Sequence, residues 1–241
     1  VMSNGAHIVQ GFRWGSRMGD GQVHDMMLGA LHDPFGHGHM GITAENISSR
    51  YQISREMQDE FALTSQKRAQ KAIENGVFKD QILPIEIKTR KGVEIFETDE
   101  HLKPDTSMET LSSLRTAFKK DGVVTAGNAS GINDGASALI LANEEKAKKS
   151  KPLARIVSYG FGGVDPDEMG MGPIPASKMA LKKAQLSVSD LDLIESNEAF
   201  AAQACAVNKQ LGLDPSKVNV NGGAIALGHP VGATGAIIMT K

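Results

Sequence analysis

A histidine in a glycine-rich turn is the side chain of this sequence best suited to chemistry. His229 follows the run Asn-Gly-Gly-Ala-Ile-Ala-Leu-Gly and precedes Pro230. Glycines let the backbone turn tightly and approach a ligand closely, and Pro230 favours the start of a helix. The positive end of a helix disfavours an imidazolium, so we expect His229 to be neutral at pH 7. A neutral imidazole can take a proton from a thiol or donate an N–H group to a developing oxyanion.

The same turn could instead bind a phosphate group. It matches neither the G-x-G-x-x-G pattern of dinucleotide-binding turns nor the Walker pattern with its lysine. The catalytic interpretation of His229 is therefore favoured.

Asn197 is the second candidate, because it lies where a predicted strand meets a predicted helix. An isolated asparagine at such a junction is ordinarily an N-cap, although its amide can also hold a water molecule. The junctions that carry Asn197 and His229 are consecutive along the chain. Consecutive strand-to-helix junctions of a parallel sheet open on the same edge, where active sites of α/β proteins form. We therefore expect the two side chains to lie close together.

The elements that must position these residues alternate between helices and strands. Apolar periodicity, caps and turn residues predict helices over residues 54–75, 107–118, 175–185 and 199–211, and another that begins just after Pro230. In the first of these, Met57, Phe61, Ala69 and Ile73 form the expected apolar stripe. A hairpin is predicted over residues 82–88 and 93–96, and further strands over residues 123–125, 136–142, 153–159, 191–195 and 218–220. We expect residues 136–142 to be buried. Alternating strands and helices are typical of a layered α/β fold.

Composition excludes several other classes of protein. The chain has 241 residues, of which 40% are hydrophobic and 22% charged, as in ordinary globular proteins. Its formal net charge of -2 gives no reason to expect nucleic acid or an anionic membrane as a partner. No apolar run approaches the ~20 residues of a membrane-spanning helix. The single cysteine, Cys205, excludes a disulfide framework and a cysteine-based zinc site within the chain, and it favours a reducing compartment.

Five segments together resemble the motifs of the thiolase family. They are Asn-Glu-Ala-Phe-Ala at residues 197–201, Gly-Gly-Ala-Ile-Ala-Leu-Gly-His-Pro-Val-Gly-Ala-Thr-Gly at 222–235, His-Met-Gly-Ile-Thr-Ala-Glu-Asn at 39–46, Thr-Ala-Gly-Asn-Ala-Ser-Gly-Ile-Asn-Asp-Gly-Ala at 125–136, and Met-Gly-Pro-Ile-Pro-Ala at 171–176. They occur in the family's order and cover nearly the whole chain.

The resemblance implies an acyl transfer through a nucleophilic cysteine, between coenzyme A thioesters. His229 would activate that thiol and form part of an oxyanion hole, and Asn197 would hold the water that completes the hole. The family resemblance further implies an α/β fold of αβαβα layers, incomplete here, with a loop domain that covers coenzyme A. Residues 1–120 would form the loop domain and the end of the N-terminal half, residues 121–150 the last strands of that half, and residues 151–241 the first part of the C-terminal half.

The resemblance also places substrate-binding residues along the chain. Apolar groups suit the pantetheine arm, and the Ser130 hydroxyl suits its amides. The implied binding residues are Leu31, His39, Met40, Thr110, Leu111, Leu114, Phe118, Ala126, Gly127, Ser130, Ala199 and Phe200. Lys103 and Arg115 lie where cations would meet the phosphates of coenzyme A, although such charges are more often simply solvated.

The sequence departs from the family in its cysteines. The family's nucleophilic cysteine lies upstream of the residues present here, and its second, acid/base cysteine lies downstream of Lys241. Cys205 belongs to neither motif and sits in an apolar helix, so we expect a buried, inert thiol. The last predicted helix also lacks a C-cap. These features predict that the chain is a fragment and inactive by itself.

Metal binding and several other functions are alternatives to this interpretation. His32, His37 and His39 cluster in a glycine-rich segment, but without a carboxylate motif a tunnel role for His39 is favoured over a metal site. No cofactor is expected, because coenzyme A is substrate or product. A non-catalytic CoA- or acyl-binding half-protein, a longer-chain 3-ketoacyl-CoA thiolase and a nucleotide-dependent oxidoreductase remain as alternatives. The His39–Met40 pair favours the acetoacetyl-CoA type, acting in fatty-acid metabolism on acetyl-CoA and acetoacetyl-CoA.

The expected oligomeric state and cellular compartment follow from the resemblance alone. It implies a homodimer or homotetramer in the cytoplasm, with an organelle not excluded since the chain opens at Val1 without an initiator Met. We expect no nucleic-acid or membrane partner.

Overall fold

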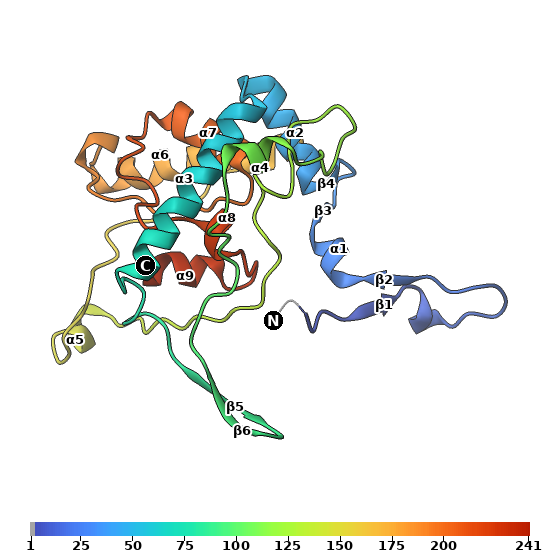
Figure 1. The fold of residues 1–241 in the computed structure, drawn as a ribbon, viewed down its shortest axis with the longest axis horizontal. Helices are drawn as coiled ribbons and strands as arrows, with labels where there is room; N and C mark the ends of the chain where they lie inside the picture. The colour runs from blue at the N-terminus through green and yellow to red at the C-terminus, as the bar shows by residue number, and fades with distance from the viewer. Residues whose placement is uncertain (1–2) are drawn as a thin grey trace.

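Packed helices form the body of the chain, and two strand pairs project from it (Figure 1). A computed structural model describes residues 3–241. Helix α7 (Ala201–Leu211) packs against both α2 (Met40–Tyr51) and α3 (Arg55–Glu74). The side chains of Ile47 and Val207 are fully buried where α2 meets α7. Removing this apolar surface from water is the main stabilisation of the body.

Apart from one helix with as many residues as α2, the other elements are short. They are β1 (His7–Val9), β2 (Val23–Asp25), α1 (Met26–Ala30), β3 (His32–Asp33), β4 (Gly38–His39), β5 (Ile85–Thr89), β6 (Gly92–Phe96), α4 (Met108–Ser112), α5 (Glu144–Ala147), α6 (Pro173–Ala184), α8 (Ala224–Leu227) and α9 (Thr234–Thr240), with 3-10 turns at Phe12–Trp14, Pro166–Met171 and Val188–Asp190. The strands form three separate antiparallel pairs, β1–β2, β3–β4 and β5–β6. No helix within residues 3–241 combines the length and apolar character needed to cross a bilayer.

Helix α3 confirms the predicted helix but not its predicted buried face. The Ser54 hydroxyl accepts a hydrogen bond from the Met57 N–H group at 3.1 Å, and Gly76 adopts a left-handed φ of 68° after the helix ends. Met57 and Ile73, expected in the apolar stripe, are exposed. Ala69 is buried and Phe61 half-buried, as expected, and the rest of the buried face carries small and polar residues such as Ala62 and Ser65. Small side chains are required there because the backbone of the loop at residue 222 lies directly against α3.

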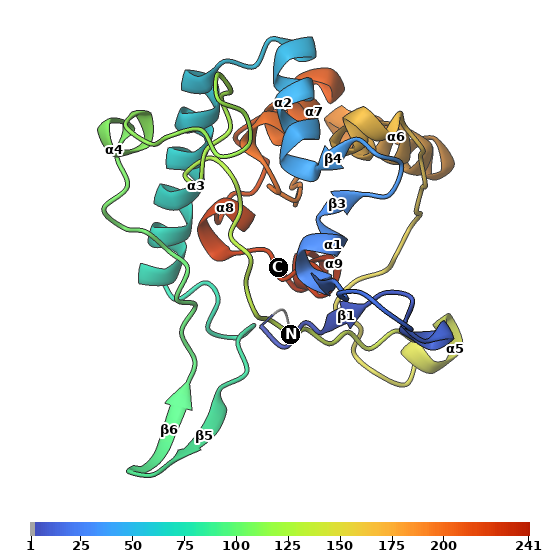
Figure 2. The same ribbon diagram turned by 90° about the vertical axis from the view of Figure 1, so that its right-hand side faces the viewer.

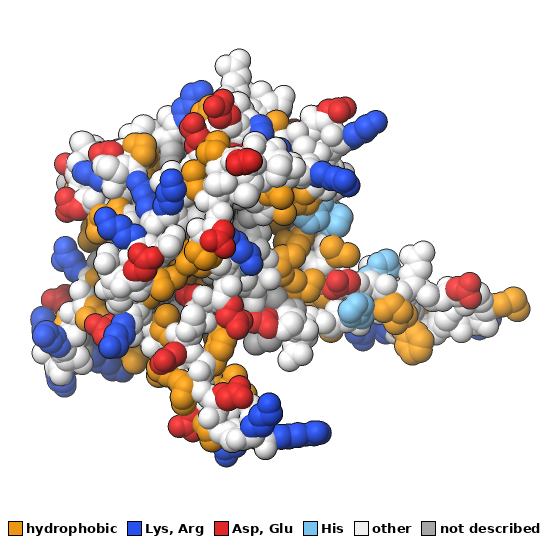
Figure 3. Space-filling model, viewed as in Figure 1, with side chains coloured by type: hydrophobic (Ala, Val, Ile, Leu, Met, Phe, Trp, Pro, Cys, Tyr) orange, Lys and Arg blue, Asp and Glu red, His pale blue; other side chains and the backbone are white. Residues whose placement is uncertain are grey.

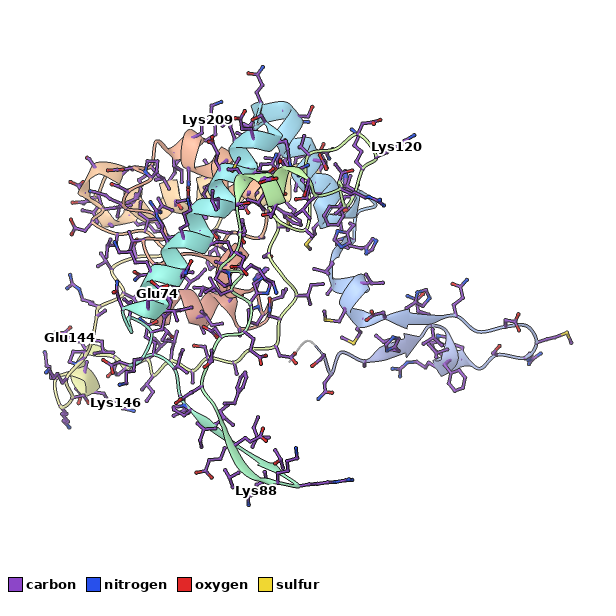
Figure 4. All side chains as sticks on the ribbon, in the orientation of Figure 1. Glu74, Lys88, Lys120, Glu144, Lys146 and Lys209 are labelled. Carbon is purple, nitrogen blue, oxygen red and sulfur yellow. The ribbon has the colours of Figure 1, made fainter. Side chains whose placement is uncertain are left out.

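The β5–β6 hairpin confirms the predicted hairpin, with a shorter first strand and a second strand that begins one residue earlier. Its register pairs Ile85 with Phe96 and Thr89 with Gly92 across the tight turn. Figure 4 places Lys88 near the free end of the hairpin, away from the body. The second projection is an arm made of β1, β2 and α1, and Figure 3 shows hydrophobic side chains along it. On this arm Trp14 is 88% exposed.

The five other predicted strands are wrong as strands in this chain. Residues 136–142 and 153–159 run as extended segments without a partner strand, and residues 123–125, 191–195 and 218–220 make only single bridges, Thr116 to Thr125 and Ile194 to Val218. Residues 136–142 were expected to be buried, yet Ile140 is 99% exposed. A strand forms only where a neighbouring strand accepts its hydrogen bonds, and these apolar segments have none within the described residues.

Helix ends also differ from the predictions. The helix predicted over 107–118 is only α4, because its Ser107 cap is followed by a single turn. Helix α9 begins at Thr234 rather than just after Pro230, and residues 231–233 form a turn closed by a hydrogen bond from the Thr234 N–H to the Pro230 carbonyl at 2.9 Å. His229 therefore lies one turn before α9 and not at its N-terminus. A helix end was expected to keep the His229 ring neutral. Burial has this effect on the ring instead, as described below.

Candidate functional site

Two loops bring His229 and Asn197 together. His229 follows α8, which lies against α3 (Figures 1 and 2). Gly228 before it has a φ of 95°, and a Cβ atom there would overlap the side chain of Asn133, so only glycine fits this turn. The Nε2 atom of His229 lies 3.4 Å from the Nδ2 atom of Asn197, which precedes α7. The predicted proximity of the two side chains is present in the structure.

Thr234 determines which nitrogen of His229 carries the proton. The Oγ1 atom of Thr234 donates to the Pro230 carbonyl at 3.0 Å and lies 2.7 Å from Nδ1 of His229. The Nδ2 group of Asn197 can only donate, so Nε2 of His229 is the acceptor and the Thr234 hydroxyl accepts a hydrogen bond from Nδ1–H. The lone pair of the ring is then on Nε2, which faces the Asn197 amide.

Burial controls the charge of His229. Loss of solvent around the ring lowers its pKa from the ordinary value of 6.5. The ring is therefore neutral at pH 7, as the sequence predicted, but the cause is desolvation rather than a helix end. A neutral ring with its lone pair on Nε2 can take a proton from a thiol and afterwards donate that proton to an oxyanion.

Asn197 has an unused acceptor. Its Oδ1 atom is buried and has no hydrogen-bond partner among the described residues, whereas its backbone carbonyl accepts from Nε2 of Gln203 at 3.2 Å. Asn197, Gly228 and Thr234 line a cavity of about 30 Å³. A space of this size holds about one water molecule. A buried amide oxygen beside such a cavity is suited to binding a water.

Glu198 joins both loops to α3. Its carboxylate, 2% exposed, accepts hydrogen bonds from Ser65 Oγ at 2.6 Å, Asn219 Nδ2 at 2.8 Å and Ile225 N–H at 3.2 Å. Desolvation raises its pKa, and these hydrogen bonds and the charge of Lys241 oppose that shift. The Asn197 loop and the His229 loop are thus held on one buried group.

Three predicted binding residues form a cluster of aromatic rings. His39 stacks on Phe118 with ring centroids 4.8 Å apart, and Phe118 meets Phe200 edge to face at 5.9 Å. A Cβ atom at Gly41 would overlap the Phe118 ring. Burial and then His32 lower the pKa of His39, so its ring packs in the neutral form. Three of the predicted binding residues therefore form one apolar wall.

Further predicted binding residues adjoin this wall. The Ser130 N–H group donates to the Ala199 carbonyl at 3.0 Å. Leu111 and Leu114 pack so closely over Gly127 that a Cβ atom there would lie 2.6 Å and 2.5 Å from their methyl groups. The absence of a side chain at residue 127 thus lets the two leucines approach the backbone.

The remaining predicted residues are less closely grouped. The Met40 N–H group donates to the Leu31 carbonyl at 2.8 Å, but Leu31 itself lines an open hollow of about 390 Å³ beside the arm. Thr110 and Ala126 are exposed, and the Thr110 hydroxyl is engaged with Ser107 in capping α4. Of these residues only Leu31 lines that hollow, so the structure does not enclose them together in one cavity.

Neither the single cysteine nor the cluster of His32, His37 and His39 takes part in the pairing of His229 with Asn197. Burial and then the charge of Glu198 raise the pKa of Cys205 to about 12, and its Sγ lies 4.0 Å from the Met57 carbonyl. Nδ1 of His32 lies 2.6 Å from the Leu28 carbonyl, and Nδ1 of His39 accepts from the Gly41 N–H. In the described part of the chain, no three side chains of the metal-ligating types come together to hold an ion.

Sequence reasoning missed Asn133, Thr234 and Glu198. Each lies inside a motif that the sequence presents, yet none received a role. The available signal in each motif was a polar side chain among glycines and alanines. Only the tertiary structure shows which groups these side chains contact.

Two family descriptions match the chain, which has the α/β fold that the sequence predicted. "Thiolase, N-terminal domain" covers residues 1–145, and "Thiolase, C-terminal domain" covers residues 150–241. A β-ketothiolase, BktB, of Cupriavidus necator is 58% identical over all of this chain and 62% of its own length. The crystal structure of Bacillus anthracis acetyl-CoA acetyltransferase superposes with a TM-score of 0.95 at 52% identity, covering 100% of this chain and 61% of that one.

A third similar protein was solved with a ligand. Human mitochondrial 3-ketoacyl-CoA thiolase in complex with CoA is 48% identical, with a TM-score of 0.93 over 99% of this chain and 60% of the human one. The chain spans less than two thirds of the length of all three of these proteins.

Proposed function

The chain belongs to the thiolase family, and on that premise we propose that the full-length protein transfers acyl groups between coenzyme A thioesters. It condenses two molecules of acetyl-CoA to acetoacetyl-CoA or catalyses the reverse thiolysis. The observation that carries the proposal is the pairing of the neutral His229 ring with Asn197, 3.4 Å apart.

Each side chain of the pair has a role in this reaction. His229 takes the proton of the nucleophilic thiol at Nε2, and the N–H group so formed donates to the oxyanion of the tetrahedral intermediate. Asn197 holds a water molecule through its free Oδ1 atom, and the adjoining cavity of about 30 Å³ supports this role. The wall of His39, Phe118 and Phe200 binds the apolar part of the substrate.

The acyl-accepting thiol comes from outside these 241 residues in this proposal. Cys205 is unsuited to that role, because a thiol with a pKa of about 12 supplies almost no thiolate near pH 7. The similar proteins from Cupriavidus necator and Bacillus anthracis are longer than this chain, which accommodates a nucleophile elsewhere in the full-length protein.

Acetyl groups are the proposed substrates, with longer acyl chains as the alternative. Acetyl-CoA acetyltransferases and a β-ketothiolase are among the similar proteins, and a 3-ketoacyl-CoA thiolase is less similar in sequence. We further propose a cytoplasmic homo-oligomer, a dimer or tetramer, acting in fatty-acid metabolism without a cofactor.

The test compares the full-length protein with its His229→Ala variant. Cleavage of acetoacetyl-CoA by free CoA is measured beside cleavage of a longer 3-ketoacyl-CoA. We expect kcat to fall by about a hundredfold or more in the variant, with an unchanged circular dichroism spectrum. His24→Ala is the matched control, because His24 is exposed on the arm, and it should retain normal kcat.

Near-normal thiolysis by His229→Ala would refute the catalytic role of His229. Faster cleavage of the longer substrate would assign the protein to the longer-chain alternative. Binding of CoA without any turnover would indicate the non-catalytic alternative.

A further inference from the structure

Asn133 connects the main chain of His229 to a second histidine. The Oδ1 atom of Asn133 accepts a hydrogen bond from the His229 backbone N–H group at 3.1 Å. Its Nδ2 atom lies 3.2 Å from Nδ1 of His101. Both groups of the amide are therefore engaged, one with the loop of His229 and one with the segment that follows the β5–β6 hairpin.

The His101 ring is fixed on three sides. Asn133 Nδ2 can only donate, so Nδ1 of His101 must be the acceptor and Nε2 must carry the proton. The backbone of Ile225 lies close enough to the ring to oppose the lowering of its pKa by burial, and a Cβ atom at Gly131 would overlap the ring. Glycine at residue 131 thus makes room for the ring.

These contacts hold the segment that ends in His229 at both ends. At its start, the Ile225 carbonyl accepts a hydrogen bond from Gln66 Nε2 at 3.3 Å and the ring of His101 contacts the same residue. At its end, Asn133 holds the backbone of His229. Only the single turn of α8 and Gly228 lie between, so little freedom remains for the position of His229.

We propose that Asn133 and His101 are positioning residues for His229, acting as one hydrogen-bonded unit. The proposal rests on the proposed function of His229 but assigns no contact with substrate to either residue. Their role is to fix the backbone at residue 229 so that Nε2 faces Asn197. Misplacing a reacting group by about 1 Å can cost about a hundredfold in rate, which sets the scale of the expected effect.

The first experiment measures acetoacetyl-CoA thiolysis by full-length Asn133→Ala. We expect kcat to fall about tenfold or more while KM for acetoacetyl-CoA stays within about twofold. Asn143→Ala is the matched control, because Asn143 caps the exposed α5 far from His229, and its kcat should be unchanged. Wild-type kcat in Asn133→Ala, or a loss confined to KM, would overturn the proposal.

A conservative variant separates positioning from packing. Asn133→Asp keeps the volume and the acceptor for the His229 N–H group but loses the donor to His101. It should recover kcat at least about threefold over Asn133→Ala, and it remains available as the folded variant if Asn133→Ala does not fold. A kcat for Asn133→Asp as low as that of Asn133→Ala, with both variants folded, would contradict the assigned bond.

A double-mutant cycle tests whether the two residues act as a unit. His101→Ala alone should lower kcat about fivefold, and the double variant should be no more than about threefold slower than Asn133→Ala, because both changes break one bond. Losses that simply multiply would show that His101 acts independently.

Hydrogen exchange supplies a readout that needs no turnover. The amides of residues 225–229 should exchange about tenfold faster in Asn133→Ala than in the wild-type protein. A wild-type protein without turnover would refute the proposed function and leave this readout intact. Unchanged exchange in the variant would refute the positioning role by itself.

Discussion

The Nδ1 atom of His229 lies 2.7 Å from the Oγ1 atom of Thr234, which is itself tied to the Pro230 carbonyl. Thr234 stands at the start of α9 and is buried. The helix therefore contributes to the site through one hydroxyl group, which selects the tautomer of the ring. The same hydroxyl keeps the Nε2 lone pair directed at Asn197.

Removing that hydroxyl should impair catalysis. Thr234→Val keeps the shape of the side chain but no longer accepts from Nδ1–H, so the tautomer and the ring orientation are no longer fixed. We expect kcat for acetoacetyl-CoA thiolysis to fall about tenfold or more. Thr234→Ser, which keeps the hydroxyl, should stay within about threefold of the wild-type rate. Equal rates for the valine and serine variants would exclude this role of Thr234.

The pH dependence of thiolysis should reflect the burial of His229. Burial lowers its pKa from 6.5, and the neutral ring is the active base, so activity is present above the lowered pKa and lost below it. The acid limb of kcat/KM should therefore have its midpoint below 6.5. A midpoint clearly above 6.5 that moves in a variant of His229 would show that the ring is stabilised in the charged form instead.

A methyl group at residue 41 should disturb the aromatic wall. A Cβ atom in Gly41→Ala would overlap Phe118, so the ring must leave its stacked position on His39. We expect a loss of about 1–3 kcal/mol in the free energy of unfolding and a KM for acetoacetyl-CoA raised about fivefold. Gly163→Ala is the control, because nothing lies within 4 Å of the added atom. Equal unfolding midpoints for the two variants would contradict the packing at Phe118.

Cys205 should be chemically inert in the folded chain. At pH 8 a thiol with a pKa of about 12 is ionised in only about one molecule in ten thousand, and Cys205 is also partly buried. A thiol reagent should label Cys205 at least about a hundredfold more slowly in native protein than in protein unfolded by guanidinium. We also expect no thiolysis by the 241-residue chain. Turnover that disappeared in Cys205→Ala would make Cys205 the nucleophile.

The helix ends and the hairpin that the sequence determined by itself depend on local hydrogen bonds. The Ser54 cap and Gly76 delimit α3, and the turn at Gly92 sets the register of β5–β6. These features depend on residues only a few positions apart, so composition and spacing suffice to predict them. The candidate roles of His229 and Asn197 could also be proposed from the sequence, because side-chain type and motif order are properties of the sequence.

Tertiary structure decided the rest, because it depends on contacts between distant parts of the chain. Residues 136–142 have the composition of a buried strand, yet they are exposed without a partner strand. Met57 and Ile73 of α3 were wrongly predicted as buried, because the buried face of the helix lies against the loop around residue 222, where small side chains are required. Asn133 acquires its role only because folding brings it to a backbone 96 positions away. Sequence spacing carries no information on such long-range hydrogen bonds, whose formation depends on the whole path of the chain.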